Sequence, residues 1–265
     1  MRLPALTELT TEGAHLLRAH DVAEYHCQDP SSFYSHMHCN RIGAVIHVVR
    51  DTLSTGRILD LGCAQGNTGL LLAEAGFQVW AVDLRSEFLE YARRKYERGG
   101  FWCVAANATT LPFQKGFFDL VVWGEMIEHV AYPEQILAEI MRVLRWKGYL
   151  LITTPNGKRF RTGLPTFSQV ADREKLVEVQ FKPDSDGHLF LFTADELTQL
   201  LRSHGLEVLH HQFYATPWIC GRLGLRHLIG WMPERRRQIC DRWTLRWGRL
   251  AERVAEGQIL LAQRQ

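Results

Sequence analysis

The chain of 265 residues contains no run of 18 apolar residues, and its first residues, Met1 to Ala5, lack an apolar signal core. We therefore expect no transmembrane segment and predict a cytoplasmic protein. The net charge is only +2, so no overall field favours nucleic acid as a partner. Internal repeats and low-complexity segments are missing too. Because 46% of the residues are hydrophobic, the chain can bury one full core with appendages.

The six cysteines include no Cys-x-x-Cys pair, which disfavours both a metal cluster and a disulfide framework. Cys63 and Cys103 lie in strand or turn contexts that we expect to be buried. The other cysteines are Cys27, Cys39, Cys220 and Cys240.

Two common nucleotide-binding motifs are missing as well. A glycine-rich turn follows the apolar run Arg57 to Leu61, but it reads Gly62-Cys63-Ala64-Gln65-Gly66-Asn67, without the second and third glycines of G-x-G-x-x-G. No lysine follows at the spacing that a triphosphate-binding loop requires. We therefore expect neither a pyrophosphate nor a triphosphate at this turn.

Two carboxylates are present where the phosphate motifs are missing. Asp60 lies two residues before Gly62, where it would repel a phosphate and attract an ammonium group. Asp83 ends the next apolar run, 21 residues beyond Gly62, near the offset at which a second-strand acid meets a ribose. S-adenosylmethionine carries an ammonium, a sulfonium and a ribose diol but no phosphate, so it fits both acids.

Five segments in order resemble the motifs of class I S-adenosylmethionine-dependent methyltransferases, over about Thr55 to Leu209. They are Ile58 to Gly66, Val82-Asp83, Ala108 to Phe113, Phe117 to Val130, and Glu139 to Gly148 with Thr154-Pro155-Asn156. The resemblance implies S-adenosylmethionine as cofactor. The residues expected to bind it are Asp60, Gly62, Cys63, Ala64, Gly66, Asp83, Leu84, Asn107, Ala108, Trp123 and Gly124.

The chain departs from the family pattern at three places. Ala64 replaces the commoner glycine and adds a methyl group beside the cofactor. Asn107 stands where many relatives have an acid, but its side-chain carbonyl can still accept a hydrogen bond from the adenine amino group. Trp146-Lys147 replaces Pro-Gly at a turn away from the cofactor. Trp123 has two open interpretations, a core side chain or a platform for adenine.

Strand and helix patterns alternate along the chain, which predicts an α/β fold. We expect a Rossmann-like, doubly wound, mostly parallel seven-stranded sheet with an N-terminal helical lid and a helical insertion before the last strand. The expected strands are 57–61, 78–82, 101–105, 120–123, 149–154, 207–211 and 259–263, and the expected core helices are 68–74, 87–97, 134–144 and 194–204. The expected units are a lid (1–54), a methyltransferase core (55–214), a basic insertion (215–256) and the last core strand (257–265).

Three segments lie outside the core. The lid offers candidate substrate contacts, namely Tyr25, Tyr34, His38 and Arg41. A polar segment, 157–187, is expected to form a loop over the site. The insertion 215–256 carries nine arginines between Gly221 and Arg253, interleaved with Trp231, Trp243 and Trp247. This mixture fits a surface for an anionic lipid, glycan or nucleic acid. We favour the plainer interpretation, in which the tryptophans pack on the domain and the arginines remain solvated.

Methyl transfer from a sulfonium is an in-line displacement, so the protein must mainly place the acceptor and exclude water. A hydroxyl acceptor must also lose a proton. The candidate catalytic residues are Glu125, Glu128, His129 and His188. The first three are spaced at i, i+3 and i+4, so a helix there would present them on one face.

This set is similar to two branches of the family, the quinone-biosynthesis O-methyltransferases and the small-RNA 3′-terminal 2′-O-methyltransferases. In the latter branch two glutamates and two histidines hold a divalent cation. The resemblance implies Glu125, Glu128, His129 and His188 as its ligands, and the ion would lower the pKa of the acceptor. The Glu-His pair also occurs in relatives without metal, where the histidine acts as a base or packs under the lid.

The function predicted from the sequence is S-adenosylmethionine-dependent O-methylation of a small molecule or a glycan or lipid intermediate. A metal-assisted RNA 2′-O-methyltransferase is the alternative within the family. A nicotinamide-dependent oxidoreductase and a non-catalytic cofactor-binding protein are the alternatives outside it. No feature of the sequence indicates the oligomeric state.

Overall fold

The computed structural model describes residues 1–26, 32–160, 162–180, 187–229 and 231–265. Cys27, residue 161 and residues 181–186 of the predicted loop segment lie outside the described residues. Within the described ranges, none of the helices combines the length and apolar content needed to cross a bilayer.

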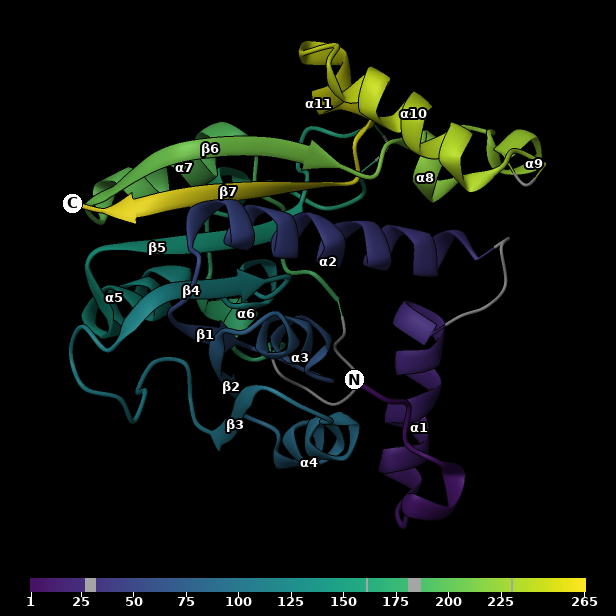
Figure 1. The fold of residues 1–265 in the computed structure, drawn as a ribbon. Coiled ribbons are helices and arrows are strands. Elements are labelled where there is room, and N and C mark those ends of the chain that lie inside the picture. The colour runs from purple at the N-terminus through teal and green to yellow at the C-terminus, as the bar shows by residue number, and fades with distance from the viewer. Residues whose placement is uncertain (27–31, 161, 181–186, 230) are drawn as a thin grey trace.

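Seven strands form one sheet in the order β3-β2-β1-β4-β5-β7-β6, which Figure 1 shows from the side. Strand β7 runs antiparallel to β5 and β6, and the other neighbouring strands are parallel. The strands are β1 (Arg57–Leu61), β2 (Gln78–Asp83), β3 (Gly100–Ala105), β4 (Phe118–Gly124), β5 (Leu144–Pro155), β6 (Leu206–Tyr214) and β7 (Gly257–Arg264). The predicted Rossmann-like, mostly parallel sheet is confirmed.

Helices cover both faces of this sheet. The core helices are α2 (Phe33–Thr52), α3 (Asn67–Glu74), α4 (Ser86–Lys95), α5 (Pro133–Val143) and α7 (Ala194–Ser203). The N-terminal elements are η1 (Leu6–Glu8), α1 (Glu12–Asp21) and η2 (Val22–His26). The remaining short elements are η3 (Ile127–His129), η4 (Phe167–Gln169), α6 (Glu174–Val177), α8 (Pro217–Cys220), α9 (Arg226–Ile229), α10 (Glu234–Leu245) and α11 (Arg249–Val254).

Successive side chains along each strand point to opposite faces of the sheet and pack into two separate hydrophobic cores. In β1, Ile58 packs with α2 and α3, whereas Leu59 and Leu61 pack with α5 and α7. A strand that is covered on both faces must be apolar throughout, which explains the continuous hydrophobic runs in the sequence.

The strand order indicates where a ligand would bind. The chain builds β1, β2 and β3 outward in one direction and then returns to place β4 on the other side of β1. Ligands of open α/β sheets bind beyond the carboxyl ends of the strands at such a reversal. The ends of β1, β2 and β4 carry Asp60, Asp83 and Gly124.

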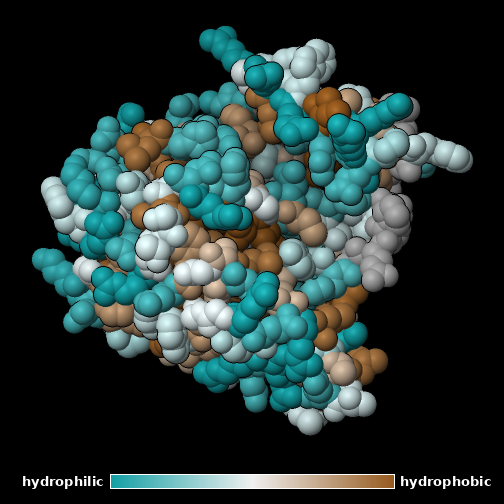
Figure 2. Space-filling model, viewed as in Figure 1, coloured by the Kyte–Doolittle hydropathy of each residue, from teal (hydrophilic) through white to brown (hydrophobic). Residues whose placement is uncertain are grey.

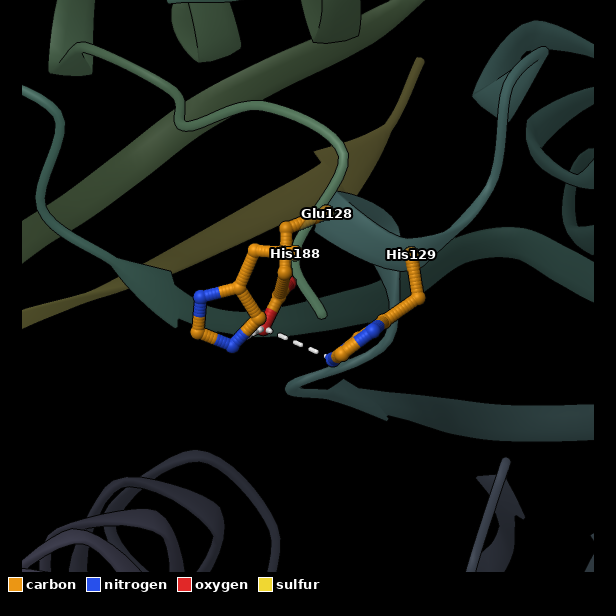
Figure 3. Close-up of side chains that lie close together, drawn as sticks. All are labelled: Glu128, His129 and His188. Carbon is orange, nitrogen blue, oxygen red and sulfur yellow. Dashed lines mark ion pairs between the residues drawn. The ribbon is translucent and has the colours of Figure 1, made fainter. Parts of the chain in front are cut away.

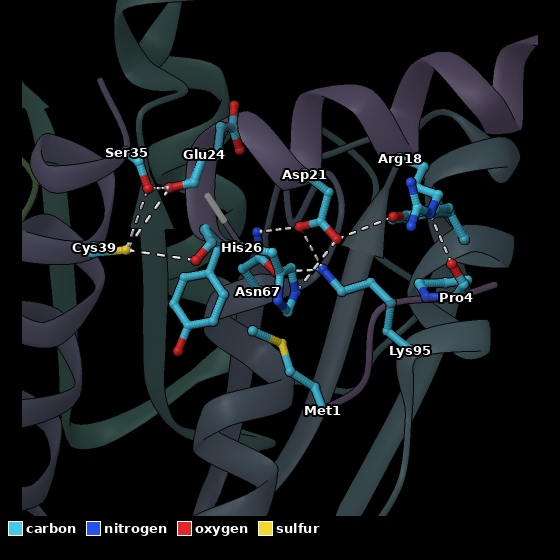
Figure 4. A network of polar contacts seen from close by, with 12 residues as sticks. Met1, Pro4, Arg18, Asp21, Glu24, His26, Ser35, Cys39, Asn67 and Lys95 are labelled. Atoms are coloured by element: carbon cyan, nitrogen blue, oxygen red, sulfur yellow. Dashed lines mark hydrogen bonds and ion pairs between the residues drawn. The ribbon is translucent and has the colours of Figure 1, made fainter. Parts of the chain in front are cut away.

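The second N-terminal helix belongs to the core rather than to a detachable cover. Val45, Val48 and Val49 of α2 are buried against the sheet. Helix α1, in contrast, is held by a polar network that Figure 4 shows, centred on Asp21. The carboxylate of Asp21 accepts hydrogen bonds from Lys95 at 2.8 Å, Asn67 at 2.9 Å and Tyr91 at 3.0 Å. The division of the chain into the four predicted units stays a prediction.

The helices of the insertion, α8 to α11, lie at one end of the sheet, beyond the end of β6 (Figure 1). Its predicted helical character agrees with the structure, but the favoured orientation of its tryptophans is wrong. Trp231, Trp243 and Trp247 are 93%, 57% and 43% exposed. The face of α10 that is turned inward carries Arg237, Asp241 and Thr244 instead. Asp241 and Thr244 lie there because polar groups of the preceding segment are available as partners.

Candidate active site

The glycine-rich turn after β1 is fixed by hydrogen bonds to β2. The backbone N–H groups of Gly62 and Cys63 both donate to the carbonyl of Val82, at 2.8 and 3.0 Å. Gly62 and Gly66 have φ angles of 71° and 74°, in the left-handed region that favours glycine. A Cβ at Gly62 would lie 2.5 Å from the sulfur of Met126, so this glycine lets the β4 loop approach the turn.

Asp60 is 4% exposed at the end of β1. Burial raises the pKa of its carboxyl to about 7, while the N–H of Gly69 and the guanidinium of Arg41 act in the opposite direction. A Cβ at Gly69 would lie 2.7 Å from Oδ2 of Asp60, so a larger residue in α3 would displace the carboxyl. The acid therefore carries only part of its charge near neutral pH, and its Oδ2 has no hydrogen-bond partner among the described residues.

Asp83 is anchored at the end of β2 by two backbone donors. Oδ2 accepts from the N–H of Ala64 at 3.0 Å, and Oδ1 accepts from the N–H of Arg85 at 3.0 Å. Each carboxylate oxygen keeps further acceptor capacity, so the pair of oxygens can still bind a diol. Leu84, the next residue, is 58% exposed beside it.

Asn107 follows β3 and is exposed, whereas its neighbour Ala108 is buried. The side-chain oxygen of Asn107 already accepts from the N–H and the hydroxyl of Thr109, at 3.0 and 2.9 Å. To accept the adenine amino group, as predicted, it would have to release one of these bonds.

Trp123 is no adenine platform. Its side chain is fully buried in the core beneath β4, and its indole N–H has no partner among the described residues. A ring without exposed surface cannot stack on a ligand, so the core interpretation of this tryptophan is correct. Cys63 is 8% exposed, and burial raises the pKa of its thiol well above the usual value.

The expectation that Glu125, Glu128 and His129 share one helical face is wrong. Glu125 lies before the short helix η3 and has a φ of 47°, a left-handed conformation that turns its side chain away from the helix. Its carboxylate accepts a hydrogen bond of 3.0 Å from the phenol of Tyr214. The carboxylate of Glu125 therefore lies outside the group of possible ligand atoms that Glu128 forms, although its charge still acts on Glu128.

Glu128, His129 and His188 do come together, as Figure 3 shows. One ligand atom of each lies within 4.8 Å of the others. The Nε2 atoms of both imidazoles lie 3.9 Å from Oε1 of Glu128, and the two rings meet edge to face at 4.8 Å. The carbonyl of Glu128 accepts from the N–H of Leu189 at 2.9 Å, which holds the distant segment of His188 here.

Glu128 and the histidines differ in exposure and charge. Glu128 is fully buried, and burial, followed by the charge of Glu125, raises the pKa of its carboxyl well above the usual value. Its Oε2 accepts from the hydroxyl of Thr154 at 3.0 Å, whereas Oε1 has no hydrogen-bond partner among the described residues. Burial lowers the pKa of His188, so its imidazole is neutral at pH 7. The cluster thus combines a buried carboxyl whose pKa is raised with an imidazole whose pKa is lowered.

Residues 59–152 match the family described as methyltransferase domain. This segment spans the glycine turn, Asp83 and the short helix of Glu128. The chain carries a class I S-adenosylmethionine-dependent methyltransferase domain.

Individual proteins whose sequences are similar to this chain are also named as methyltransferases. A protein of Mycobacterium tuberculosis named "probable S-adenosylmethionine-dependent methyltransferase" is 32% identical over 148 residues, which are 56% of this chain and 47% of that protein. The ubiquinone biosynthesis O-methyltransferase of Xylella fastidiosa is 32% identical over 162 residues, 60% of this chain and 64% of that enzyme. The chain therefore spans about half to two thirds of the length of these curated relatives.

The fold of the methyltransferase domain is also that of solved structures. An S-adenosylmethionine-dependent methyltransferase from Mesorhizobium loti superposes with a TM-score of 0.55 at 19% identity. The match covers 82% of this chain and 96% of that one. At this identity the likeness concerns the fold.

The structure adds residues to the methyltransferase domain's site that the sequence motifs do not contain. Tyr214 is 5% exposed and binds Glu125 from the end of β6, nearly ninety positions away in the chain, so no local pattern could indicate it. Thr153 of β5 is fully buried with a hydroxyl that lacks a partner among the described residues. Arg41, predicted as a lid contact, lies near Gly124: a Cβ there would be 3.6 Å from its guanidinium.

Arg41 places a partly buried positive charge beside these acids. Burial lowers the pKa of its guanidinium, but Glu125 and Tyr214 more than offset this effect, and the pKa is raised. His38 lies on the same side of α2, 3.4 Å from Arg41, and burial lowers the pKa of this imidazole to about 3. His38 is therefore neutral, and Tyr34, its ring neighbour at 4.4 Å, is 49% exposed.

Proposed function

We propose that this protein transfers the methyl group of S-adenosylmethionine to an oxygen atom of a small, lipid-like or glycan-like acceptor. The observation that carries the proposal is the pair of imidazoles, His129 and His188, which lie 28% and 32% exposed above a buried carboxyl. A hydroxyl acceptor must lose its proton as the methyl group is transferred, and these imidazoles are groups that can take it.

The cofactor would lie across the ends of β1 and β2. S-adenosylmethionine supplies a methyl group on a positively charged sulfur and a ribose with two hydroxyls. Asp83, already held by two N–H groups, offers both carboxylate oxygens to the diol, and Asp60 offers a carboxyl to the positively charged end. Arg41 offers a compensating positive charge for a carboxylate. The donors and acceptors present therefore suit this cofactor.

The acceptor would approach from the side of His129 and His188. Its oxygen forms a bond to the methyl carbon as the bond from carbon to sulfur breaks, and its proton passes to a neutral imidazole. His188 is suited to this role, because burial keeps it uncharged at neutral pH. Glu128 beneath both rings would orient them and stabilise the imidazolium that forms, as buried carboxyl partners of histidine do.

Relatives support an oxygen acceptor of this kind. Ubiquinone biosynthesis O-methyltransferase is the name of the Xylella fastidiosa relative, which points to a phenolic hydroxyl on a molecule with an apolar tail. A C-methyltransferase of ubiquinone and menaquinone biosynthesis is also similar, at 26% identity over 170 residues. An experiment must therefore distinguish methylation of oxygen from methylation of carbon.

The test is incubation of the protein with methyl-labelled S-adenosylmethionine and catechols that carry apolar tails, followed by mass spectrometry of the products. We expect an O-methyl ether and a loss of turnover of about 10²-fold or more in His188→Asn. His210→Asn, at an exposed position of β6, is the matched control and should turn over normally. A C-methylated product, or an unchanged rate in both His188→Asn and His129→Asn, would refute the proposal.

A second candidate is assistance by a divalent cation. The specific observation in its favour is that Oε1 of Glu128 has no hydrogen-bond partner among the described residues and faces the Nε2 atoms of His129 and His188. An ion there would be held by these three residues, while Glu125, bonded to Tyr214, is placed outside the set. It would supply Lewis-acid activation of the acceptor hydroxyl. Full activity after treatment with a chelator would exclude this candidate, and loss restored by magnesium, manganese or zinc would support it.

A further inference from the structure

Helix α10 faces the protein with polar residues and faces solvent with apolar ones, the reverse of an ordinary surface helix. Its inward residues are polar: Arg237, Asp241 and Thr244 are 4%, 3% and 6% exposed. Its outward residues include Ile239 and Trp243, which are 51% and 57% exposed. Surface helices normally bury their apolar stripe and expose their polar side. An apolar stripe that faces solvent indicates a surface that binds something else.

Two of the three inward residues, Asp241 and Thr244, have specific hydrogen-bond partners that fix this orientation, whereas Nε of Arg237 has none among the described residues. The carboxylate of Asp241 accepts from the backbone N–H of Thr216 at 2.8 Å. The hydroxyl of Thr244 accepts from the indole N–H of Trp218 at 3.0 Å. If the helix were turned over, the N–H of Thr216 and the indole N–H of Trp218 would lose these acceptors, which is costly where such donors are buried.

The outward face combines aromatic and cationic side chains. We call it the Trp-Arg face and define it by Arg235, Arg236, Ile239, Arg242, Trp243, Arg246 and Trp247. At 3.6 residues per turn, Arg235, Ile239, Arg242 and Trp243 fall on the side of α10 away from the buried polar residues, and Arg236 lies on its flank. Arg246 and Trp247 follow the helix, which ends at Leu245. Figure 2 shows hydrophilic and hydrophobic side chains mixed over this upper part of the molecule.

Among the described residues, the positive charge of the Trp-Arg face is offset only in part, by the charge of Asp241 beside Arg242. None of its four arginines forms an ion pair with any residue in the described ranges. The acidic residues nearby are engaged elsewhere: Glu256 binds Arg159 and Arg222, and Glu252 binds Lys158. The face therefore presents unpaired guanidinium groups beside exposed indoles.

We propose that the Trp-Arg face docks on an anionic lipid bilayer. Indole rings prefer the boundary between headgroups and acyl chains, where their apolar body is buried and their N–H stays hydrated. Guanidinium groups beside them bind the anionic headgroups. A helix with both kinds of residue on one face lies in the plane of the membrane interface.

Single-stranded RNA fits this face less well. Base stacking needs open aromatic faces, whereas Trp243 and Trp247 contact each other edge to face, with centroids 4.1 Å apart. An exposed Ile239 between the arginines also adds nothing to a phosphate-binding surface. Charge and apolar area together favour the bilayer.

The docking surface is connected to the candidate active site. Thr216, which anchors α10 through Asp241, lies two residues beyond Tyr214, which binds Glu125. A docked face would thus bring the ends of the strands near the membrane surface, where a lipid-soluble acceptor resides. Only this last consequence rests on the proposed methyl transfer, because lipid binding can be measured without turnover.

The test is flotation of the full chain with vesicles of phosphatidylcholine alone or with about one third phosphatidylglycerol. We expect binding to the anionic vesicles that exceeds binding to the neutral ones by more than about tenfold and weakens with salt. Trp243→Ala/Trp247→Ala and, separately, Arg235→Gln/Arg236→Gln/Arg242→Gln should each reduce binding at least about tenfold, because they remove the apolar and the charged part of the face.

Matched controls keep the result specific. Trp146→Ala removes an indole that is 63% exposed on β5, and Arg50→Gln/Arg98→Gln/Arg202→Gln removes three exposed arginines elsewhere. Both should bind vesicles like the wild type, and all variants should bind S-adenosylmethionine normally in calorimetry. For the unaltered protein, brominated lipids should quench tryptophan fluorescence, which needs no variant to fold.

Several outcomes would overturn the inference. It would be refuted by equal binding to neutral and anionic vesicles. Binding at the wild-type level by both the tryptophan variant and the arginine variant would also refute it, as would a lack of quenching by brominated lipids. Tighter binding to a single-stranded RNA through the same residues would reassign the face to nucleic acid. A dimer in light scattering that Trp243→Ala/Trp247→Ala dissociates would reassign it to a second copy of this chain.

Discussion

The carboxylate of Asp21 lies 2.8 Å from the ammonium nitrogen of Lys95, and neither side chain is exposed to solvent. Asp21 ends α1 and Lys95 ends α4, so this ion pair fastens the N-terminal helix to the core. Lys95 also donates to the side chain of Asn67, the first residue of α3 after the glycine turn. The attachment of α1 and the shape of the cofactor turn therefore depend on the same three side chains.

Removing one partner of this ion pair should strongly lower the stability of the folded protein. Lys95→Met leaves Asp21 as a buried charge without its partner, and we expect a loss of about 3 to 5 kcal/mol in the free energy of unfolding. Asp21→Asn/Lys95→Met should lose less than the sum of the single changes, because no uncompensated charge remains. Urea denaturation measures both. Lys175→Met, in an exposed pair with Asp172, is the control and should cost at most about 1 kcal/mol; an equal loss there would contradict a special role for the buried pair.

Cofactor affinity should depend on the ionisation of Asp60. Burial raises the pKa of this carboxyl to about 7, so it gains its negative charge as the pH rises through that value. A positively charged ligand favours the ionised form, and affinity for S-adenosylmethionine should fall by up to about tenfold between pH 7 and pH 6. Calorimetry over this range should show the trend in the wild type and not in Asp60→Asn. A flat profile in the wild type would show that Asp60 does not face the cofactor's charge.

The raised pKa of Asp60 should also make the folded protein less stable as the pH rises, whereas it makes cofactor binding tighter. In the folded state Asp60 holds its proton up to about pH 7, whereas in the unfolded chain it releases it near the ordinary value of 3.8. Between these values the folded state binds more protons, so this group makes the protein less stable as the pH rises. Asp60→Asn should therefore be more stable than the wild type at pH 8 and similar to it near pH 4.

Asp83 should contribute charged hydrogen bonds to the cofactor's ribose. We expect Asp83→Ala to weaken S-adenosylmethionine binding by about 1.5 to 3 kcal/mol, the scale of hydrogen bonds to a charged group. Asp51→Ala, at an exposed position of α2, is the control and should bind normally. Because Asp83 also holds the N–H of Ala64, the thermal stability of the variant should be measured alongside. Unchanged affinity would remove Asp83 from the site.

Replacing Ala64 with glycine should make the protein more stable. Its φ of 45° lies in the left-handed region, which a residue with a Cβ adopts only at a cost. We expect Ala64→Gly to raise the free energy of unfolding by about 1 kcal/mol, although glycine makes the unfolded chain more flexible. Ala19→Gly, at an exposed position in α1, should change stability in the opposite direction by about 0.5 to 1 kcal/mol. A destabilised Ala64→Gly would mean that the methyl group makes contacts worth more than the strain.

The sequence predicted the sheet and the nucleotide turn because each rests on a local pattern. Strands covered on both faces must be apolar, and Asp60 and Asp83 end two such runs. Glu125 could not be placed in this way, since its left-handed backbone breaks the helical spacing that the sequence suggests. Tyr214 could not be found at all, because only the pairing of β6 with β7 carries it to the end of β4.

The orientation of α10 was misjudged for a related reason. Composition rules assume that tryptophan is covered and arginine is solvated, and most helices obey them. Here the buried side is chosen by hydrogen bonds from Thr216 and Trp218, which lie outside the helix and are visible only in three dimensions.

Strand β7 follows β6 in the chain but lies between β5 and β6 in the sheet. During synthesis, β5 and β6 must therefore leave the ribosome with unpaired edges and wait for residues 257–264 to join them. Such edges are templates for wrong pairing with other nascent chains. Shortening the chain before this strand should thus yield insoluble protein rather than a smaller folded domain.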